Sequence, residues 1–196
     1  MRRTIFFLFC VGIFGAIAWL SLSVLSIVSE RKAVSERVQF LPSTTWTSLN
    51  GHHISVNETT KQGTILLFFT TTCPFCRTEI EDLINDIDRF IDTRIVLLSG
   101  EPQASLAEYA TELGINGVGN IEVVVDEGHS LASHFGIERV PTTFVYSADG
   151  RLLDRFDGMV HPKILFESLV RPSPDSQSLG GAREDEAAVL SETVGP

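Results

Sequence analysis

Residues 64–70, TILLFFT, form an unbroken apolar run of the length of one β-strand, and a pair of cysteines follows almost at once. A run without polar alternation is typical of a strand that is buried on both faces. The next segment, 74–91, predicts an amphipathic helix, because its apolar residues recur at helical spacing. These residues are Ile80, Leu83, Ile84, Ile87 and Ile91. Cys73 and Cys76 therefore lie where a buried strand passes into a helix.

Strand-like and helix-like segments alternate along the rest of the chain. An Asn-Gly pair predicts a hairpin over 46–56, and an Asp-Gly pair predicts a second hairpin over 142–156. The segments between and after them read as strands at 93–99 and 121–126 and as helices at 104–115, 130–137 and 161–170. This alternation predicts an α/β fold with a mainly parallel sheet that is covered on both faces. The last hairpin adds an antiparallel edge.

The N-terminal segment predicts a membrane anchor. No charged residue occurs from Thr4 to Ser29, and Arg2 and Arg3 precede this stretch. A helix of that length crosses a hydrocarbon core of about 30 Å. Positive charge stays on the cytoplasmic side, so we expect a single transmembrane helix over 1–29 in the cytoplasmic membrane, with the N-terminus inside. A cleaved signal peptide is the alternative, although its apolar core is usually only about 7–15 residues long.

Composition divides the rest of the chain into three parts. Residues 30–39 are rich in charge and read as a juxtamembrane linker, followed by one domain over 40–170. Residues 171–196 are rich in Ser, Gly, Pro and acidic side chains, which predicts a disordered acidic tail. The whole chain carries a formal net charge of −10. Nucleic-acid binding is therefore not expected, because it needs a basic surface.

Cys73 and Cys76 are the cysteines of the expected extracytoplasmic part, because Cys10 lies inside the apolar N-terminal segment. The extracytoplasmic space is oxidising, so a cysteine pair there can do redox chemistry. Pro74 suits the first turn of the predicted helix, and the free N–H groups and dipole of that turn favour a thiolate at Cys73. The thiolate is the form that attacks a disulfide. Cys76, one turn further on, is the natural resolving thiol.

Two other interpretations of the pair stay open. A structural disulfide that closes so short a loop restrains the unfolded chain very little. A metal site needs three or four ligands. The histidines available as further ligands are scattered along the chain, at His52, His53, His129, His134 and His161. The position of the CxxC motif between a buried strand and a helix favours the redox pair, which needs no bound cofactor.

A proline-containing segment supports the redox interpretation. The sequence GIERVPTTFVY places Pro141 at the start of a predicted strand, a position where proline is tolerated. The Val140–Pro141 peptide bond is either cis, as a special role would suggest, or an ordinary trans bond.

The strand–CPFC–helix segment, together with VPTTFVYSADGRLLDRFDG, resembles the thioredoxin superfamily. It is most similar to the TlpA/ResA-like group of membrane-anchored, extracytoplasmic thiol–disulfide oxidoreductases. The resemblance covers residues 40–170. It implies a thioredoxin-like fold, a mixed central sheet flanked by helices, with an N-terminal hairpin and a helix–strand insertion over 104–126.

The resemblance also implies roles for individual residues. Cys73 is then the attacking cysteine, and Cys76 is the resolving cysteine of the redox disulfide. The residues expected to contact the substrate are Val140, Pro141, Pro74 and Phe75. Glu79 matches an acidic position that is thought to tune the thiols in this group. The alternative for Glu79 is a solvated carboxylate in the first turn, where the helix dipole favours negative charge.

The sequence departs from the family pattern at several positions. Thr72 replaces a tryptophan that usually precedes the first cysteine, and Leu67 replaces the buried acid of thioredoxins. The resolving thiol therefore lacks its usual base, unless Glu79 or water serves. The dipeptide between the cysteines is Pro74-Phe75 rather than Gly-Pro, so the direction of electron flow is open.

The expected function is the reduction of protein disulfides, apocytochrome c among them, with electrons from a membrane thiol donor. One alternative is a peroxidase, because Thr70 and Cys73 match part of a peroxiredoxin motif, although position 66 is Leu instead of the expected proline. The other is a non-enzymatic binding module, such as a copper metallochaperone, in which His129 or His134 would supply a ligand.

Overall fold

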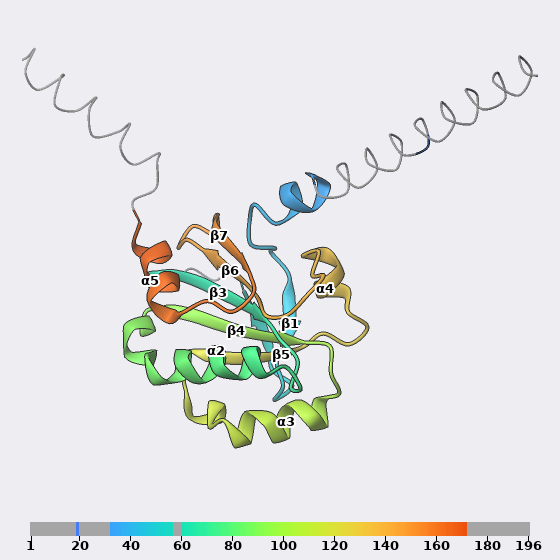
Figure 1. The fold of residues 1–196 in the computed structure, drawn as a ribbon, viewed down its shortest axis with the longest axis vertical. Helices are drawn as coiled ribbons and strands as arrows, with labels where there is room; N and C mark the ends of the chain where they lie inside the picture. Colours follow the sequence, from blue (N-terminus) through green and yellow to red (C-terminus); the bar gives the residue numbers. More distant parts are fainter. Residues whose placement is uncertain (1–18, 20–31, 57–59, 172–196) are drawn as a thin grey trace, which may run out of the picture.

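The structure is a computed structural model that describes Trp19, residues 32–56 and residues 60–171 (Figure 1). The expected anchor over 1–29 lies outside the described residues except for Trp19, and the expected tail lies outside them from residue 172 on. Within the described part of the chain, no helix is both long and apolar enough to cross a membrane. The anchor and the tail therefore stay predictions.

The described residues form an α/β fold. Its strands are β1 (Thr45–Thr47), β2 (His53–Ser55), β3 (Gly63–Phe68), β4 (Thr93–Ser99), β5 (Ile121–Val125), β6 (Thr142–Tyr146) and β7 (Leu152–Asp157). Its helices are α2 (Pro74–Asn85), α3 (Gln103–Glu112), α4 (Ser130–His134) and α5 (Pro162–Val170), with 3₁₀ turns η1 (Ile87–Phe90) and η2 (Ile115–Gly117). The predicted order of strands and helices is confirmed.

The central sheet has five strands in the order β5-β4-β3-β6-β7. Strands β3, β4 and β5 are parallel, whereas β6 is antiparallel to β3 and β7 is antiparallel to β6. The β1–β2 hairpin forms a separate small sheet. The mixed sheet predicted from the sequence is therefore present, and its antiparallel pair begins directly beside the central strand β3.

Both faces of the sheet are buried, as the apolar run of β3 predicts. Ile65 and Leu67 face a core layer that α2, α3 and α5 cover. Leu66 and Phe68 face a second layer, which the β1–β2 hairpin and the Phe135 end of α4 cover. Figure 1 shows α2 and α3 below the strands and α4 beside β1, away from these two helices. The cysteines therefore follow the central strand of the sheet, which is buried on both faces.

The helix predicted over 74–91 is shorter in the structure. Helix α2 ends at Asn85, because Asp86 adopts φ −100° and ψ 16°, and the chain continues as the 3₁₀ turn η1. This change of helical pitch rotates the later residues, so that Phe90 is fully buried whereas Ile91 is 78% exposed. The prediction that Ile91 lies on the apolar face of one continuous helix was therefore wrong.

The segment expected to be a linker over 30–39 packs in part onto the domain. Residues 32–37 are helical, and Val38 is buried in the second core layer. The hydroxyl of Tyr146 donates a hydrogen bond to the carbonyl oxygen of Val38 at 3.0 Å. The folded unit therefore begins before residue 40.

Candidate active site

The Cys73 sulfur caps the N-terminus of α2. The Cys73 backbone is extended, with φ −86° and ψ 112°, and its Sγ accepts a hydrogen bond from the N–H of Cys76 at 3.2 Å. Pro74 opens the helix, where no intrahelical N–H bond is lost. A sulfur in this position faces the positive end of the helix dipole, which favours its thiolate form. The half-buried Cys73 is also within reach of a reactant.

Cys76 has a very different environment. Its thiol is fully buried in the core layer beneath α2. Burial and the hydrogen bond with Cys73 raise the pKa of Cys76 to about 12. Both cysteines are free thiols in the structure. At neutral pH the pair thus combines one accessible sulfur with one protonated sulfur directly behind it.

Glu79 lies on the buried side of the same helix. Its side chain is 0% exposed, so the alternative of a solvated first-turn carboxylate was wrong. Its Oε1 accepts a hydrogen bond from the Thr143 hydroxyl at 2.7 Å, and its Oε2 accepts one from the Val160 N–H at 3.3 Å. Burial outweighs these bonds and raises the pKa of Glu79 to about 7. The carboxyl therefore changes its protonation state near neutral pH.

The pairing of β3 with β6 shows where Glu79 lies relative to Leu67, the residue at the position of the buried acid of thioredoxins. Leu67 on β3 pairs across the sheet with Thr143 on β6. Thr143 is the residue whose hydroxyl binds Glu79. A buried carboxylate therefore lies beside the strand pair that contains Leu67, but it reaches there from helix α2 rather than from β3.

Pro141 lies at the same edge of the sheet as the cysteines. The Val140–Pro141 bond is cis. Phe68, the last residue of β3, pairs with Thr142, so Pro141 lies beside the point where the chain leaves β3 toward Cys73. The Pro141 carbonyl oxygen accepts a hydrogen bond from the Gly158 N–H at 2.9 Å.

That hydrogen bond brings a third segment to the site, which the sequence did not reveal. Met159 lies between Gly158, which bonds Pro141, and Val160, which bonds Glu79. Met159 is half-exposed, and Phe75 is 62% exposed. Apolar side chains thus stand at the surface on segments that adjoin Cys73 and Pro141. No local pattern marks Met159, because its place depends on the return of β7 across the sheet.

The histidines are not gathered into one site. The ring of His129 packs against Gly100, so close that a Cβ there would lie 2.6 Å from Nε2. His134 meets the Phe135 ring edge-on, with centroids 5.2 Å apart. In residues 32–56 and 60–171, no group of three or more His, Cys, Asp or Glu side chains is arranged to hold a metal ion.

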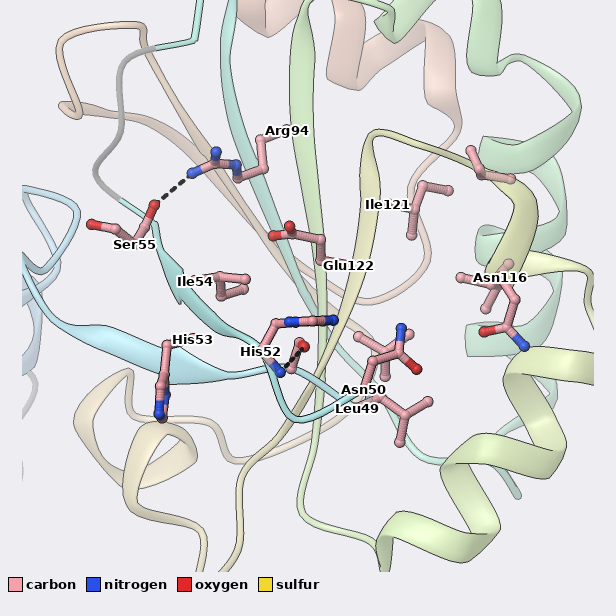
Figure 2. A pocket seen from close by; sticks show the side chains of 14 residues that line it. Leu49, Asn50, His52, His53, Ile54, Ser55, Arg94, Asn116, Ile121 and Glu122 are labelled. Carbon is pink, nitrogen blue, oxygen red and sulfur yellow. Dashed lines mark hydrogen bonds between the residues drawn. The ribbon is translucent and has the colours of Figure 1, made fainter.

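A cavity of about 400 Å³ lies away from the cysteines, between the β1–β2 hairpin and the starts of β4 and β5 (Figure 2). His52 and His53 line it, together with Arg94 and Glu122. Arg94 donates a hydrogen bond to the Ser55 carbonyl oxygen at 2.6 Å. The cavity is at the opposite end of the parallel strands from Cys73, so it is not part of the dithiol site.

The family assignment rests on a match over most of the folded domain. The model of the AhpC/TSA family matches residues 39–155. The chain belongs to this family, within the thioredoxin superfamily. The thiol–disulfide oxidoreductase ResA of Halalkalibacterium halodurans is 21% identical over 79% of this chain and 95% of the relative. ResA of Bacillus thuringiensis is 20% identical over 60% of this chain and 67% of the relative.

Solved structures share the fold. StoA from Bacillus subtilis has a TM-score of 0.52 and 21% identity, over 65% of this chain and 98% of its own. A secreted Mycobacterium tuberculosis disulfide oxidoreductase homologous to E. coli DsbE has a TM-score of 0.55 and 19% identity, over 68% of this chain and 96% of its own. The peroxidoxin BcpB from the same organism reaches 0.58 at 18% identity, over 68% and 96%. The thioredoxin-like fold is confirmed, and with the ResA relatives so is the expected enzyme class, thiol–disulfide oxidoreductase.

Proposed function

We propose that the protein reduces disulfides of other proteins outside the cytoplasmic membrane through the Cys73–Cys76 couple. The observation that carries this proposal is the contrast between the two thiols. Cys73 is accessible and lies at a helix N-terminus, whereas Cys76 is buried and donates its N–H to the Cys73 sulfur. A structural disulfide does not need this asymmetry, but a two-step exchange reaction does.

In the first step, the Cys73 thiolate attacks one sulfur of the substrate disulfide. A Cys73–substrate S–S bond forms, and the substrate S–S bond breaks. The released substrate sulfur leaves as a thiolate and takes a proton from water. The N–H of Cys76 and the helix dipole stabilise the attacking thiolate before the reaction.

In the second step, Cys76 loses its proton and attacks the Cys73 sulfur. The Cys73–Cys76 disulfide forms, and the second substrate thiolate leaves and is protonated. The substrate has then gained two electrons and the enzyme has lost two. A pKa of about 12 keeps Cys76 protonated without help, so this step needs a base. Glu79, whose pKa is about 7, is half ionised at neutral pH and takes this role directly or through water.

The environment of the buried thiol, Cys76, supports the reducing direction. Strongly oxidising pairs owe their potential to a stabilised reduced form, usually through a stabilised thiolate. Here burial raises the pKa of Cys76, and Glu79 adds negative charge beside it. Among the described residues, the hydrogen bond to the Cys73 sulfur comes from a backbone N–H and not from a basic side chain.

The surface around Cys73 suits an extended, partly apolar protein segment. Phe75 and Met159 are exposed apolar side chains on segments that adjoin the site, and Val140 precedes the cis-proline. A small substrate would not need such a surface. Unfolded apocytochrome c, with its cysteine pair in an extended chain, is one substrate of this kind.

Membrane attachment follows from the sequence of residues 1–29, which we propose to be a single helix with its N-terminus in the cytoplasm. The uncharged stretch from Thr4 to Ser29 and the preceding Arg2 and Arg3 support this orientation. The oxidised enzyme must be reduced again after each cycle, and an oxidising compartment offers no pool of thiols. A membrane protein with a dithiol is therefore the expected electron donor.

The test is the reduction potential of the Cys73–Cys76 pair in the full chain in detergent. A potential near about −270 mV or lower identifies a reductant, whereas one near about −120 mV identifies an oxidant and contradicts the proposal. Consumption of hydrogen peroxide faster than that of a protein disulfide would instead favour a peroxidase. Labelling of Cys73 in intact cells by a membrane-impermeant maleimide tests the extracytoplasmic location.

A further inference from the structure

We propose that Glu101 is a positioning residue. It holds the segment before Cys73 in place and thereby fixes the orientation of the Cys73 side chain. This inference rests on the proposed exchange function. After Phe69, whose N–H bonds the Leu98 carbonyl oxygen at 3.0 Å, the chain leaves the sheet and must reach the start of α2. The direction of the Cys73 side chain depends on how this short connection is fixed.

Glu101 binds the connection between β3 and α2 at Thr71, two residues before Cys73. One carboxylate oxygen accepts the Thr71 N–H at 2.6 Å, and the other accepts the Thr71 hydroxyl at 2.9 Å. Both bonds are assisted by the carboxylate charge, which makes them stronger than neutral hydrogen bonds. Two bonds from one rigid group fix the orientation of Thr71 as well as its position.

Glu101 is itself held by the sheet. It follows β4, and its N–H and its carboxylate both bond the Ser99 hydroxyl at 3.3 Å. Ser99 is buried at the end of β4. The neighbouring Gly100 is covered by the His129 ring, which fills the space that a side chain at Gly100 would need. The carboxylate is therefore a fixed point rather than a mobile surface group.

The position of Thr71 is linked to that of the Cys73 sulfur by backbone hydrogen bonds. The Cys73 N–H donates to the Thr70 carbonyl oxygen at 3.2 Å, which closes a turn that has Thr71 inside it. The Cys73 sulfur in turn bonds the Cys76 N–H at 3.2 Å. A shift of Thr71 would therefore turn the Cys73 side chain away from the helix N-terminus.

The test compares Glu101→Ala with Glu101→Gln in the full chain. The amide of glutamine accepts a hydrogen bond from the Thr71 N–H and donates one to the Thr71 hydroxyl. Glu101→Gln therefore keeps both hydrogen bonds and removes only the charge. The readout is the rate constant for attack of Cys73 on glutathione disulfide over a range of pH, where the high-pH plateau reports the fully ionised thiolate. We expect Glu101→Ala to lower the plateau about tenfold or more, and Glu101→Gln to stay within about threefold of the parent protein.

The loss of charge affects both variants, so any change in the pH midpoint should be shared, whereas the plateau loss should be specific to alanine. Thr71→Val, which removes the hydroxyl bond only, should give an intermediate loss that does not add to that of Glu101→Ala. Glu112→Ala is the control, because it removes a surface carboxylate bound to Arg77 and not to the connection. Its plateau should equal that of the parent protein.

Hydrogen exchange at the Thr71 amide separates this inference from the proposed function. The amide should exchange slowly in the parent protein and fast in Glu101→Ala, whether or not protein disulfides are substrates. An unchanged plateau in a folded Glu101→Ala variant would overturn the inference. So would a Glu101→Gln variant as impaired as Glu101→Ala, because charge rather than position would then explain the loss.

Discussion

The reactive groups on the two sides of helix α2 differ in their exposure to solvent. On its outer side, Phe75 is exposed and the Cys73 sulfur is half-buried, and the chemistry depends on the helix N-terminus. On its inner side, Cys76 and Glu79 are fully buried, and their protonation depends on desolvation. Cys76 follows Cys73 by one turn and Glu79 follows by one more, so a thiol that contacts the substrate lies close to a thiol and a carboxyl that are shielded from water.

This difference in exposure explains why Cys73 attacks the substrate first and Cys76 attacks second in the proposed reaction. An exposed first thiol can react with a bulky disulfide, and a buried second thiol can react only with the sulfur beside it. The raised pKa of Cys76 prevents it from competing for substrate. The raised pKa of Glu79 gives the interior one group that accepts a proton near neutral pH. The following predictions test this division between an outer and an inner side.

The largest effect should come from exchanging the sulfur of either cysteine for oxygen. Cys73→Ser should abolish attack on a disulfide, by roughly three orders of magnitude or more, because the exposed nucleophile is lost. Cys76→Ser should still attack but stop at the mixed disulfide, which mass spectrometry of the intact protein detects. Equal trapping by both variants would show that the two thiols are not divided into attacking and resolving roles.

The inner side should be most sensitive at Glu79. Glu79→Gln should slow the closure of the Cys73–Cys76 disulfide by about 100-fold at pH 8, since it removes the proposed base. The parent closure rate should rise with pH and bend near 7, the pKa of Glu79, and the variant should lack this bend. Stopped-flow measurement of closure separates this step from the attack, which should change little. A bend near 7 that persists in Glu79→Gln would assign it to another group.

Glu79 should also make stability depend on pH. Its pKa is about 7 in the folded protein and 4.5 for the free side chain, so the folded state keeps a proton that the unfolded state has lost between these values. The stabilisation is therefore complete below pH 4.5 and is lost as the pH rises to about 7. A shift of about 2.5 units corresponds to roughly 3 kcal/mol in the free energy of unfolding.

Urea unfolding between pH 4.5 and 8 measures this slope. Glu79→Gln should flatten it, because glutamine carries no proton to lose and can keep both polar contacts. A parent protein whose stability rises across this range, with no difference in the variant, would contradict the raised pKa.

The smallest effect should be on the outer side at Phe75. Phe75→Ala should raise the KM for an unfolded protein disulfide about fivefold and leave kcat and stability nearly unchanged, because the side chain is 62% exposed. Ile91→Ala is the matched control, since Ile91 is also an exposed apolar residue but lies beyond the far end of α2. Equal changes in both variants would mean that Phe75 has no special place in substrate binding.

Local sequence patterns were sufficient to predict the order of the strands and helices and the position of the dithiol. The apolar run before Cys73 marks a strand buried on both faces, and Pro74 marks the helix that follows. These signals are local, because strand burial, helix periodicity and capping depend on residues that are close along the chain. They failed where the helix changes pitch after Asn85, since Asp86 gives no clear stop signal and packing of Phe90 decides the end.

Tertiary structure alone decided the state of the groups around the dithiol. The residues next to Glu79 in the sequence do not show whether its side chain is solvated or buried. The contacts of its carboxylate with Thr143 and Val160 show that it is buried. Glu101 meets Thr71 across 30 residues of sequence. The physical reason is that desolvation and hydrogen bonding depend on which distant segments cover a side chain. The sequence placed the sulfurs, but the packing of β6, β7 and the loop after β4 set their environment.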